Sequence, residues 1–419
     1  MIDLPNLLTK RAVHSHSGAS EKGFFGRRLW IQLLLISSLA LSACSQINQD
    51  HLKAGGADYR HYPTGGGLFV TAAFGPDGRL WRIVPEKHHV YVDYSTDLGN
   101  TFSAPVPINT EEQHIKISGE NRPGIAVDHA GRVYVIYTAE SNQPATVYFS
   151  SSGDNGRSFS APTPLGDKTP VANSFQGRLA LSPSGQAYAF WHDERNRTDW
   201  KQPGNAIYYA TIDNRGNPAP ARQLSDTLCD CCRIAVAFDN NNSPVLLARF
   251  VYPGGIRDHG LIKLQADGQK TQETRATFDQ WAIEACPDHG PAIAISDNTY
   301  HIAWFTQGSV RQGLFYAYSS DQGQHFSNPL SFGYVGKLPS HPDIIAKSNH
   351  ITLAWTEFDG NKTQLLIMQS HDGGQSWLPA KAVAETTDKA DFPFLLSKNE
   401  EVYVSWNSKN EGYRLIPVN

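Results

Sequence analysis

Charge, methionine and long hydrophobic runs are all scarce in this chain of 419 residues, and each scarcity excludes a class of protein. Charged residues make up 18% of the chain, too few for a largely disordered protein when 11% of the residues are aromatic. The 36 basic and 40 acidic side chains give a net charge of -4, without the basic excess of nucleic-acid-binding modules. Only 2 methionines occur, whereas 35 glycines and 25 prolines punctuate the chain. This composition predicts an all-β protein with many short strands and no nucleic acid as a partner.

One apolar run lies near the N-terminus, at residues 31–43. Two consecutive arginines, Arg27 and Arg28, precede it, with two residues in between. A helix of this length is too short to cross a hydrocarbon core of roughly 30 Å, so the run is interpreted as a signal segment. It ends in Leu-Ser-Ala-Cys at residues 41–44, which resembles the lipobox of bacterial lipoproteins. The resemblance implies cleavage before Cys44 and acylation of its thiol. The alternative is an ordinary secretory signal that a cysteine follows by chance.

The lipobox also implies a location and a division of the chain. A lipid anchor on Cys44 would hold the protein to a bilayer of the bacterial cell envelope, and Ser45, in place of an aspartate, favours the outer membrane over the inner one. We therefore expect a signal peptide at 1–43, a linker with a closing strand at 44–64, and one domain at 65–419.

A repeated motif is the most informative feature of the sequence. Four segments fit Ser-x-Asp-x-Gly-x-x-(Phe/Trp), and their aspartates are Asp97, Asp154, Asp321 and Asp372. In such a turn the aspartate accepts backbone N–H bonds, and glycine supplies the positive φ. The motif resembles the Asp-box, or bacterial neuraminidase, repeat of the sialidase-like β-propellers. We expect the four aspartates to order hairpin turns and to contact no ligand.

The spacing of the repeat predicts the number of blades. The first two boxes lie 57 residues apart and the last two 51, and apolar strands open a new unit at similar intervals. These seven openings lie near Phe69, Ile125, Leu179, Ile234, Ala292, Ile344 and Phe394. We predict a β-propeller of seven four-stranded antiparallel blades, with the six blades of sialidases as the alternative. The last unit, 390–419, has room for three strands only, so residues 56–66 are expected to supply the missing one.

The resemblance to sialidases raises the question of catalysis. It implies three arginines that bind a carboxylate, a tyrosine nucleophile activated by a glutamate, and an aspartate acid/base. The first of these arginines belongs to an Arg-Ile-Pro motif, and the nearest match is Arg82-Ile83-Val84-Pro85, which has one residue more. This match also falls in a predicted second strand, away from the propeller axis. The sequence therefore assigns no catalytic residue and leaves the enzyme question open.

Three arginines stand where consecutive inner strands begin: Arg122, Arg178 and Arg233. Because these strand starts crowd round the axis of a propeller, the three side chains are candidates for a cationic cluster that binds a carboxylate or sulfate. The alternative is that each arginine pairs with a nearby acid, such as Glu120, and rigidifies the channel mouth.

Four of the five cysteines remain once Cys44 is set aside. Cys229, Cys231 and Cys232 precede one predicted inner strand, and Cys286 precedes the next. Two disulfides are one interpretation, and Cys229–Cys232 with Cys231–Cys286 is the pairing with the least strain. The other interpretation is a copper or zinc site, joined by His289 and His341, which stand at the offset of Cys232 in the next two units.

Three functions are compatible with these features. The first is a membrane-anchored propeller that binds a ligand or a soft metal at its channel mouth. The second is a sialidase-like glycoside hydrolase that acts on acidic glycans. The third is a scaffold for a protein of the cell envelope. The arginine, cysteine and histidine residues at the strand entrances favour the first, and a carbohydrate ligand is compatible with it.

Overall fold

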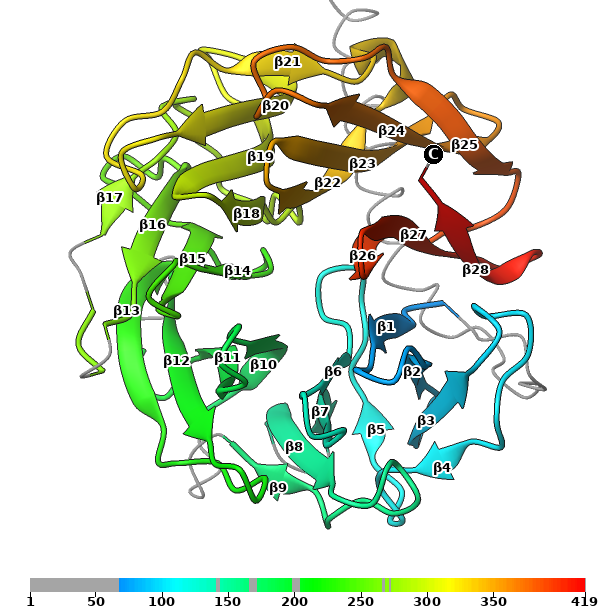
Figure 1. Ribbon diagram of the computed structural model, residues 1–419. Helices are drawn as coiled ribbons and strands as arrows, with labels where there is room; N and C mark the ends of the chain where they lie inside the picture. The colour runs from blue at the N-terminus through cyan, green and yellow to red at the C-terminus, as the bar shows by residue number, and fades with distance from the viewer. Residues whose placement is uncertain are drawn as a thin grey trace, which may run out of the picture. The chain divides into compact units, whose positions relative to one another are not determined.

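The computed structural model describes residues 68–418 apart from 141–143, 166–171, 198–203, 266–267 and 271–272. The predicted signal segment, Cys44 and the closing strand expected within 56–66 lie outside these residues. Seven β-sheets stand in a ring about a common axis (Figure 1). The predicted all-β propeller is confirmed, and it has seven blades rather than the six of the alternative. In the part of the chain described, no helix is long and apolar enough to span a membrane.

Successive strands of a blade run from the axis outwards, each antiparallel to the one before (Figure 1). Blade one contains β1 (Thr71–Phe74), β2 (Leu80–Pro85), β3 (Val90–Ser95) and β4 (Val106–Pro107). Blade two contains β5 (His114–Ile115), β6 (Gly124–Val127), β7 (Val133–Glu140), β8 (Thr146–Ser152) and β9 (Thr163–Pro164). Blade three contains β10 (Ser174–Leu181), β11 (Ala187–Asp193), β12 (Asn205–Ile212) and β13 (Arg222–Leu228). Blades four and five contain β14 (Ala235–Phe238), β15 (Pro244–Arg249), β16 (His259–Lys263) and β17 (Thr274–Arg275); and β18 (Ala292–Ser296), β19 (Thr299–Gln307), β20 (Gln312–Ser319) and β21 (Leu330–Phe332). After the 3-10 turn η2 (Val335–Lys337), blades six and seven contain β22 (Ser340–Lys347), β23 (His350–Phe358), β24 (Thr363–Ser370) and β25 (Lys381–Thr386); and β26 (Phe394–Lys398), β27 (Glu401–Ser408) and β28 (Gly412–Pro417).

The second strand of each blade forms much of the core because a neighbouring blade covers each of its faces. In β2 and β15 every residue is buried, which explains why these strands lack the polar alternation of a half-exposed sheet. Burying one large apolar side chain in such an interface contributes about 1.5–3 kcal/mol. The second strands of five blades each place one fully buried tryptophan there: Trp81, Trp191, Trp304, Trp355 and Trp406.

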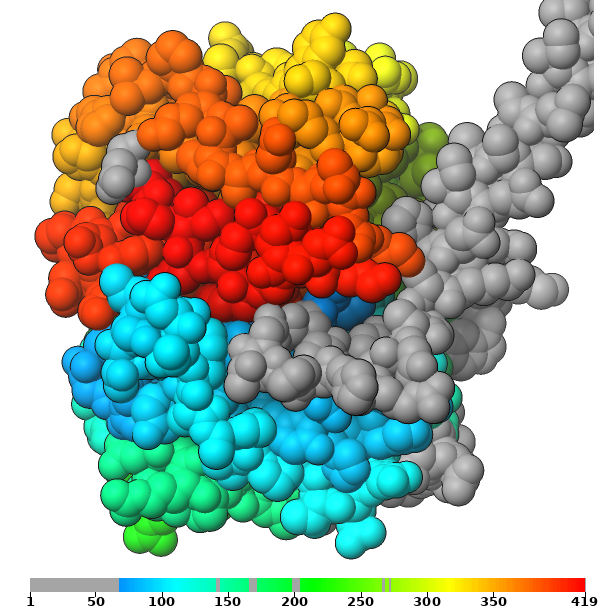
Figure 2. All heavy atoms as spheres, turned by 90° about the vertical axis from the view of Figure 1, so that its right-hand side faces the viewer, coloured from blue at the N-terminus to red at the C-terminus, as the bar shows by residue number. Residues whose placement is uncertain are grey.

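The seventh blade closes the ring. Its three described strands, red in Figure 2, lie between blade six and blade one. The Phe69 N–H donates to Asp391 Oδ2 at 2.6 Å, joining the entrances of blades one and seven. Arg82 lies in β2, as expected, and its buried guanidinium pairs with Asp93 at 2.6 Å and stands 3.2 Å from the Phe102 ring. Arg82 therefore supports the blade interface and takes no part in the channel.

Each Asp-box carboxylate is bonded inside its own turn. Asp154 Oδ1 accepts hydrogen bonds from Ser152 Oγ at 2.7 Å and from the Ser158 N–H at 3.0 Å. Ser152 Oγ in turn accepts the Gly156 N–H at 2.8 Å. Bonds from Ser158 and Ser152 hold the pKa of Asp154 well below its usual range. The equivalent aspartate-to-serine and aspartate-to-backbone bonds occur at Asp97, Asp321 and Asp372.

Candidate functional site

Blade two departs from the regular pattern in a way that fills the centre of the ring. Its inner strand is divided into β5 and β6, which both pair with β7, and residues 116–123 leave the sheet between them. We call these residues the channel loop. Asn121 fixes it, because its side chain donates to the Lys116 carbonyl at 2.9 Å and accepts from Thr138 Oγ1 and the Gln176 N–H, also at 2.9 Å. The loop is thus tied both to its own blade and to blade three.

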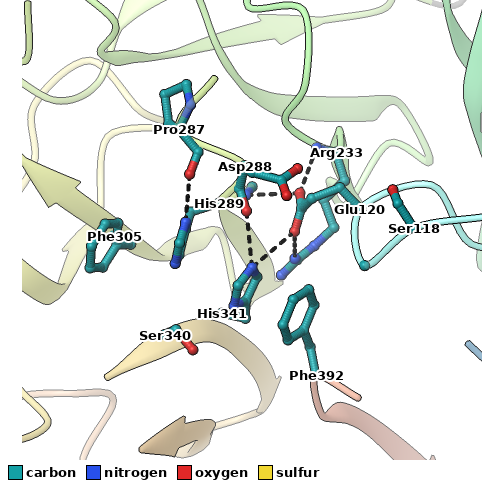
Figure 3. Close-up of polar contacts among 12 residues, drawn as sticks. Ser118, Glu120, Arg233, Pro287, Asp288, His289, Phe305, Ser340, His341 and Phe392 are labelled. Carbon is teal, nitrogen blue, oxygen red and sulfur yellow. Dashed lines mark hydrogen bonds and ion pairs between the residues drawn. The ribbon is translucent and has the colours of Figure 1, made fainter. Parts of the chain in front are cut away.

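Glu120, at the tip of the channel loop, carries a fully buried carboxylate. Its Oε1 accepts from Arg233 Nη1 at 2.7 Å, and its Oε2 accepts from the Arg233 N–H at 2.8 Å and the Gly290 N–H at 2.9 Å (Figure 3). A side chain at Gly290 would collide with both Glu120 and Arg233, so glycine is required there. We call this arrangement the Glu120 clamp, and it joins blade two to blades four and five.

Two histidines pack beside the clamp. The His289 and His341 rings are stacked with centroids 4.1 Å apart (Figure 3). His289 also stacks on Phe305, and His341 on Phe392. His341 Nε2 lies 3.0 Å from the Asp288 carbonyl and 3.6 Å from Glu120 Oε1. Burial lowers the pKa of His289 to about 4 and that of His341 well below its usual value, so both rings are neutral at pH 7.

The three arginines line a central cavity of about 140 Å³. Arg233 is held by the Glu120 clamp, which is the pairing of the alternative interpretation. Arg122 donates through Nε to the Gly119 carbonyl and through Nη1 to the Phe392 carbonyl, but its buried Nη2 has no partner among the described residues. Arg178 makes no hydrogen bond or ion pair within the described part of the chain. Both arginines therefore retain N–H donors at the cavity.

Phe394, the first residue of β26, organises the arginine cluster. The guanidinium carbons of Arg122, Arg178 and Arg233 lie 5.0, 5.8 and 6.0 Å from the centre of its ring. A cation within about 6 Å of an aromatic face is attracted to it, which offsets part of the repulsion among three like charges. The sequence places Phe394 at the opening of the seventh inner strand, but it gives no sign that this residue contacts the three arginines.

Positive and negative side chains lie close together at the cavity. Burial lowers the pKa of Arg122 and of Arg178, and the charge of Arg233 acts in the same direction. The carboxylates of Glu120 and Asp343 also line the cavity, but burial raises the pKa of Asp343. Asp391, whose pKa burial also raises, lies 3.8 Å from Arg122. A bound anion would relieve the electrostatic repulsion among the arginines and accept hydrogen bonds from their remaining N–H groups.

Three residues around the same channel have strained backbones. Gln176, Asp288 and His341 have φ values of 51°, 52° and 51°, in the left-handed region that residues other than glycine rarely adopt. Such residues persist only where their surroundings hold them, and they are common at binding sites. Gln176 is held by the bond to the channel loop and by its own donation to the Cys231 carbonyl at 2.9 Å.

The structure divides the six residues of the expected metal or disulfide cluster into two groups. Among the described residues, only Cys229, Cys231 and Cys232 form a group able to hold a metal ion, with all three sulfurs within 4.8 Å of one another. Cys286 contacts Cys231, and none of the four thiols is joined in a disulfide. Hydrogen bonds from Cys231 and Cys232, together with the charge of Arg257, lower the pKa of Cys229. His289 and His341 belong instead to the group around the Glu120 clamp.

No family model matches the chain, and no curated protein sequence matches it. Solved structures resemble its fold. An ulvan lyase of a polysaccharide lyase family is 13% identical with a TM-score of 0.56, over 85% of this chain and 94% of that one. The BP39L lectin from Burkholderia pseudomallei is 12% identical with a TM-score of 0.54, over 85% and 100% of the two chains. A Hadza microbial sialidase is 13% identical with a TM-score of 0.49, over 82% and 74%.

Fold and comparisons together define the chain as a seven-bladed β-propeller. At such low identity the likeness concerns the fold alone, and function has to be argued from the site. The described residues that line the cavity include no tyrosine, so the nucleophile of a sialidase has no counterpart there. The sequence suggested Glu120 as a partner of the arginines, but not the bond from Gly290 or the roles of Asp343 and Phe394, because these act through contacts between blades.

Proposed function

We propose that this propeller binds the carboxylate or sulfate group of an acidic ligand in its central cavity. The observation that carries the proposal is that Arg122 and Arg178 both line the cavity: the buried Nη2 of Arg122 has no acceptor among the described residues, and Arg178, which is half-buried, makes no hydrogen bond to them. A buried guanidinium nitrogen without a partner is costly, and an anion is the group that satisfies it best. Proteins bury such donors where a ligand accepts their hydrogen bonds.

An acidic saccharide is the ligand class that we propose, since a sugar acid or sulfated sugar offers a compact anionic group on a larger polar body. One solved ulvan lyase of similar fold was bound to a saccharide of glucuronic acid and sulfated rhamnose. That likeness concerns the fold, and the arginine geometry supports the proposal independently. Binding without cleavage is favoured over glycoside hydrolysis because no tyrosine is found among the described residues that line the cavity.

The anchoring of the chain is part of the same proposal. Cys44 ends the apolar segment 31–43, and acylation there would tether the propeller to the bacterial cell envelope, with the outer membrane favoured. The cavity would then face ligands of the envelope or its surroundings. Binding to a partner protein of the envelope is a separate proposal.

Isothermal titration with sulfate, glucuronate and neutral glucose tests the binding proposal. Arg178→Ala removes a group with no protein partner, so the fold should be retained while anion affinity falls. A hydrogen bond to a charged group contributes about 1.5–3 kcal/mol, which corresponds to about a 10- to 100-fold loss. Arg215→Ala, on an exposed turn outside the cavity, is the matched control and should bind as the unaltered protein does. Equal anion affinity in Arg178→Ala would overturn the proposal.

A further inference from the structure

Four sulfur atoms gather beside the channel on two neighbouring loops. Cys229, Cys231 and Cys232 lie between β13 and β14, and their sulfurs are all within 4.8 Å of one another. Cys286 lies on the loop that enters β18, and its sulfur contacts that of Cys231. Two of the sulfurs are wholly buried, on Cys229 and Cys232, whereas Cys286 is exposed. The cluster therefore leads from the surface into the protein.

A buried cation faces one of the two buried sulfurs. Arg257 Nη1 donates to Cys229 Sγ at 3.0 Å, and its Nε donates to the Ile283 carbonyl at 2.9 Å. Arg257 is 8% exposed, and placing its charge there is costly unless a negative group accompanies it. A thiolate on Cys229 is such a group, and thiolates are the forms of cysteine that bind metals. This contact is a second sign, independent of the clustering, that the sulfurs are arranged for a ligand.

The donor set selects the kind of metal. The compact group consists of sulfur alone, with no carboxylate or imidazole in it, which disfavours magnesium, calcium and manganese. Metal–sulfur bonds of about 2.3 Å in a trigonal site put the sulfurs about 4 Å apart, in keeping with the observed limit. Structural zinc sites require four ligands, whereas three clustered thiolates suit the softer monovalent copper.

We propose that Cys229, Cys231 and Cys232 bind one Cu(I) ion as thiolates, and that exposed Cys286 makes the first contact with the incoming ion. Each ligating thiol gives its proton to solvent, so binding weakens as the pH falls. The site is separate from the arginine cavity and does not depend on the function proposed for it.

The position of the sulfurs links the two sites. Cys232 directly precedes Arg233, and Cys286 stands four residues before Gly290, so both cysteine loops continue into donors of the Glu120 clamp. Gln176, which lines the cavity, donates to the Cys231 carbonyl. A metal ion bound by Cys229, Cys231 and Cys232 fixes the loop that continues into Arg233 of the clamp. Copper binding should therefore raise the thermal midpoint of the propeller as well as occupy the thiols.

Anaerobic titration of the reduced full-length protein with Cu(I), in competition with bathocuproine disulfonate, tests the proposal. We expect one Cu(I) per chain, a sulfur-only first shell by X-ray absorption, and a rise in the thermal midpoint. Cys231→Ser should lower the Cu(I) affinity at least 100-fold, whereas Cys286→Ser should slow Cu(I) uptake about tenfold and leave the affinity unchanged. Cys44→Ser changes the only other cysteine of the chain and is the matched control, with unchanged affinity.

Several outcomes would overturn the proposal. Cu(I) lost entirely to the competitor, or held equally by Cys231→Ser, would exclude the site. Four-sulfur binding of Zn(II) in preference to Cu(I) would show a structural zinc centre instead. Two disulfides that resist mild reduction would show that the cysteines are covalent links. Should Cys231→Ser fail to fold, the exposed Cys286→Ser variant and the X-ray absorption spectrum of the unaltered protein still decide the matter.

Discussion

Replacing Glu120 by glutamine should lower the stability of the propeller and raise its affinity for anions. The carboxylate accepts three hydrogen bonds, at 2.7, 2.8 and 2.9 Å, from Arg233 and Gly290. An amide has a single acceptor oxygen, so at least one donor would face an NH2 group. Losing a hydrogen bond to a charged group costs about 1.5–3 kcal/mol, and Glu120→Ala should cost about 3–5 kcal/mol because Arg233 would stay buried without its counter-ion.

The gain in anion affinity has a different cause. Glu120 is a negative group of the cavity wall and the internal counter-ion of Arg233. Two like charges about 6 Å apart repel by about 3 kcal/mol at an effective dielectric constant of about 20. Removing the Glu120 charge should therefore tighten sulfate binding tenfold or more, although the fold is weaker.

Urea unfolding and sulfate titration of the same samples separate the two effects. Glu112→Gln is the matched control, since Glu112 is exposed and lies shortly before the channel loop, and neither quantity should change in it. If Glu120→Gln weakens both the fold and sulfate binding, Glu120 shapes the anion site and does not compete with the anion. That result would refute the reasoning.

Three further predictions concern pH, the repeat and the anchor. Burial lowers the pKa of His301 to about 4, so the unfolded chain binds a proton that the folded chain excludes, and stability falls as the pH drops from about 6.5 to about 4. Urea unfolding of His301→Phe should show about 3 kcal/mol less of this loss across that range, and an unchanged pH profile would contradict the assignment. Asp154→Ala should lower the thermal midpoint through its unsatisfied turn amides and leave sulfate affinity untouched, whereas a selective loss of binding would give the Asp-box a role that the structure does not support. Cys44→Ser should move the protein from the membrane to the soluble fraction on cell fractionation, and a normally processed variant that stays in the membrane would exclude lipid anchoring.

The architecture was predictable because short sequence motifs determine its turns and strands, and these motifs are repeated along the chain. Each Asp-box turn is ordered by bonds within five residues, as at Ser152, Asp154 and Ser158, so the motif identifies the turn without knowledge of the rest of the fold. Counting the apolar strands that open each unit then gives seven blades. The division of the inner strand of blade two into β5 and β6 was not predictable, because it depends on how residues 116–123 fill the channel.

The site was predictable only in part, since its contacts join residues far apart in the chain. The repeat predicts Arg122, Arg178 and Arg233 at strand entrances, and the structure brings them to one cavity, although Arg178 lies within β10 and not at its start. The partner of Arg233 lies 113 residues away, and spacing alone could not choose between Glu120 and an external anion. The equal offset of Cys232, His289 and His341 was misleading, because the loops turn their side chains into two different groups.

Anomalous diffraction from crystals equilibrated with a low millimolar concentration of selenate tests the central claim most directly. Selenate has the shape and charge of sulfate, and its selenium can be located without ambiguity. We predict one peak in the central cavity, within hydrogen-bond distance of Arg178 and of Arg122 Nη2, and its loss in crystals of Arg178→Ala. A cavity that holds only water, or a peak that persists unchanged in Arg178→Ala, would contradict the account.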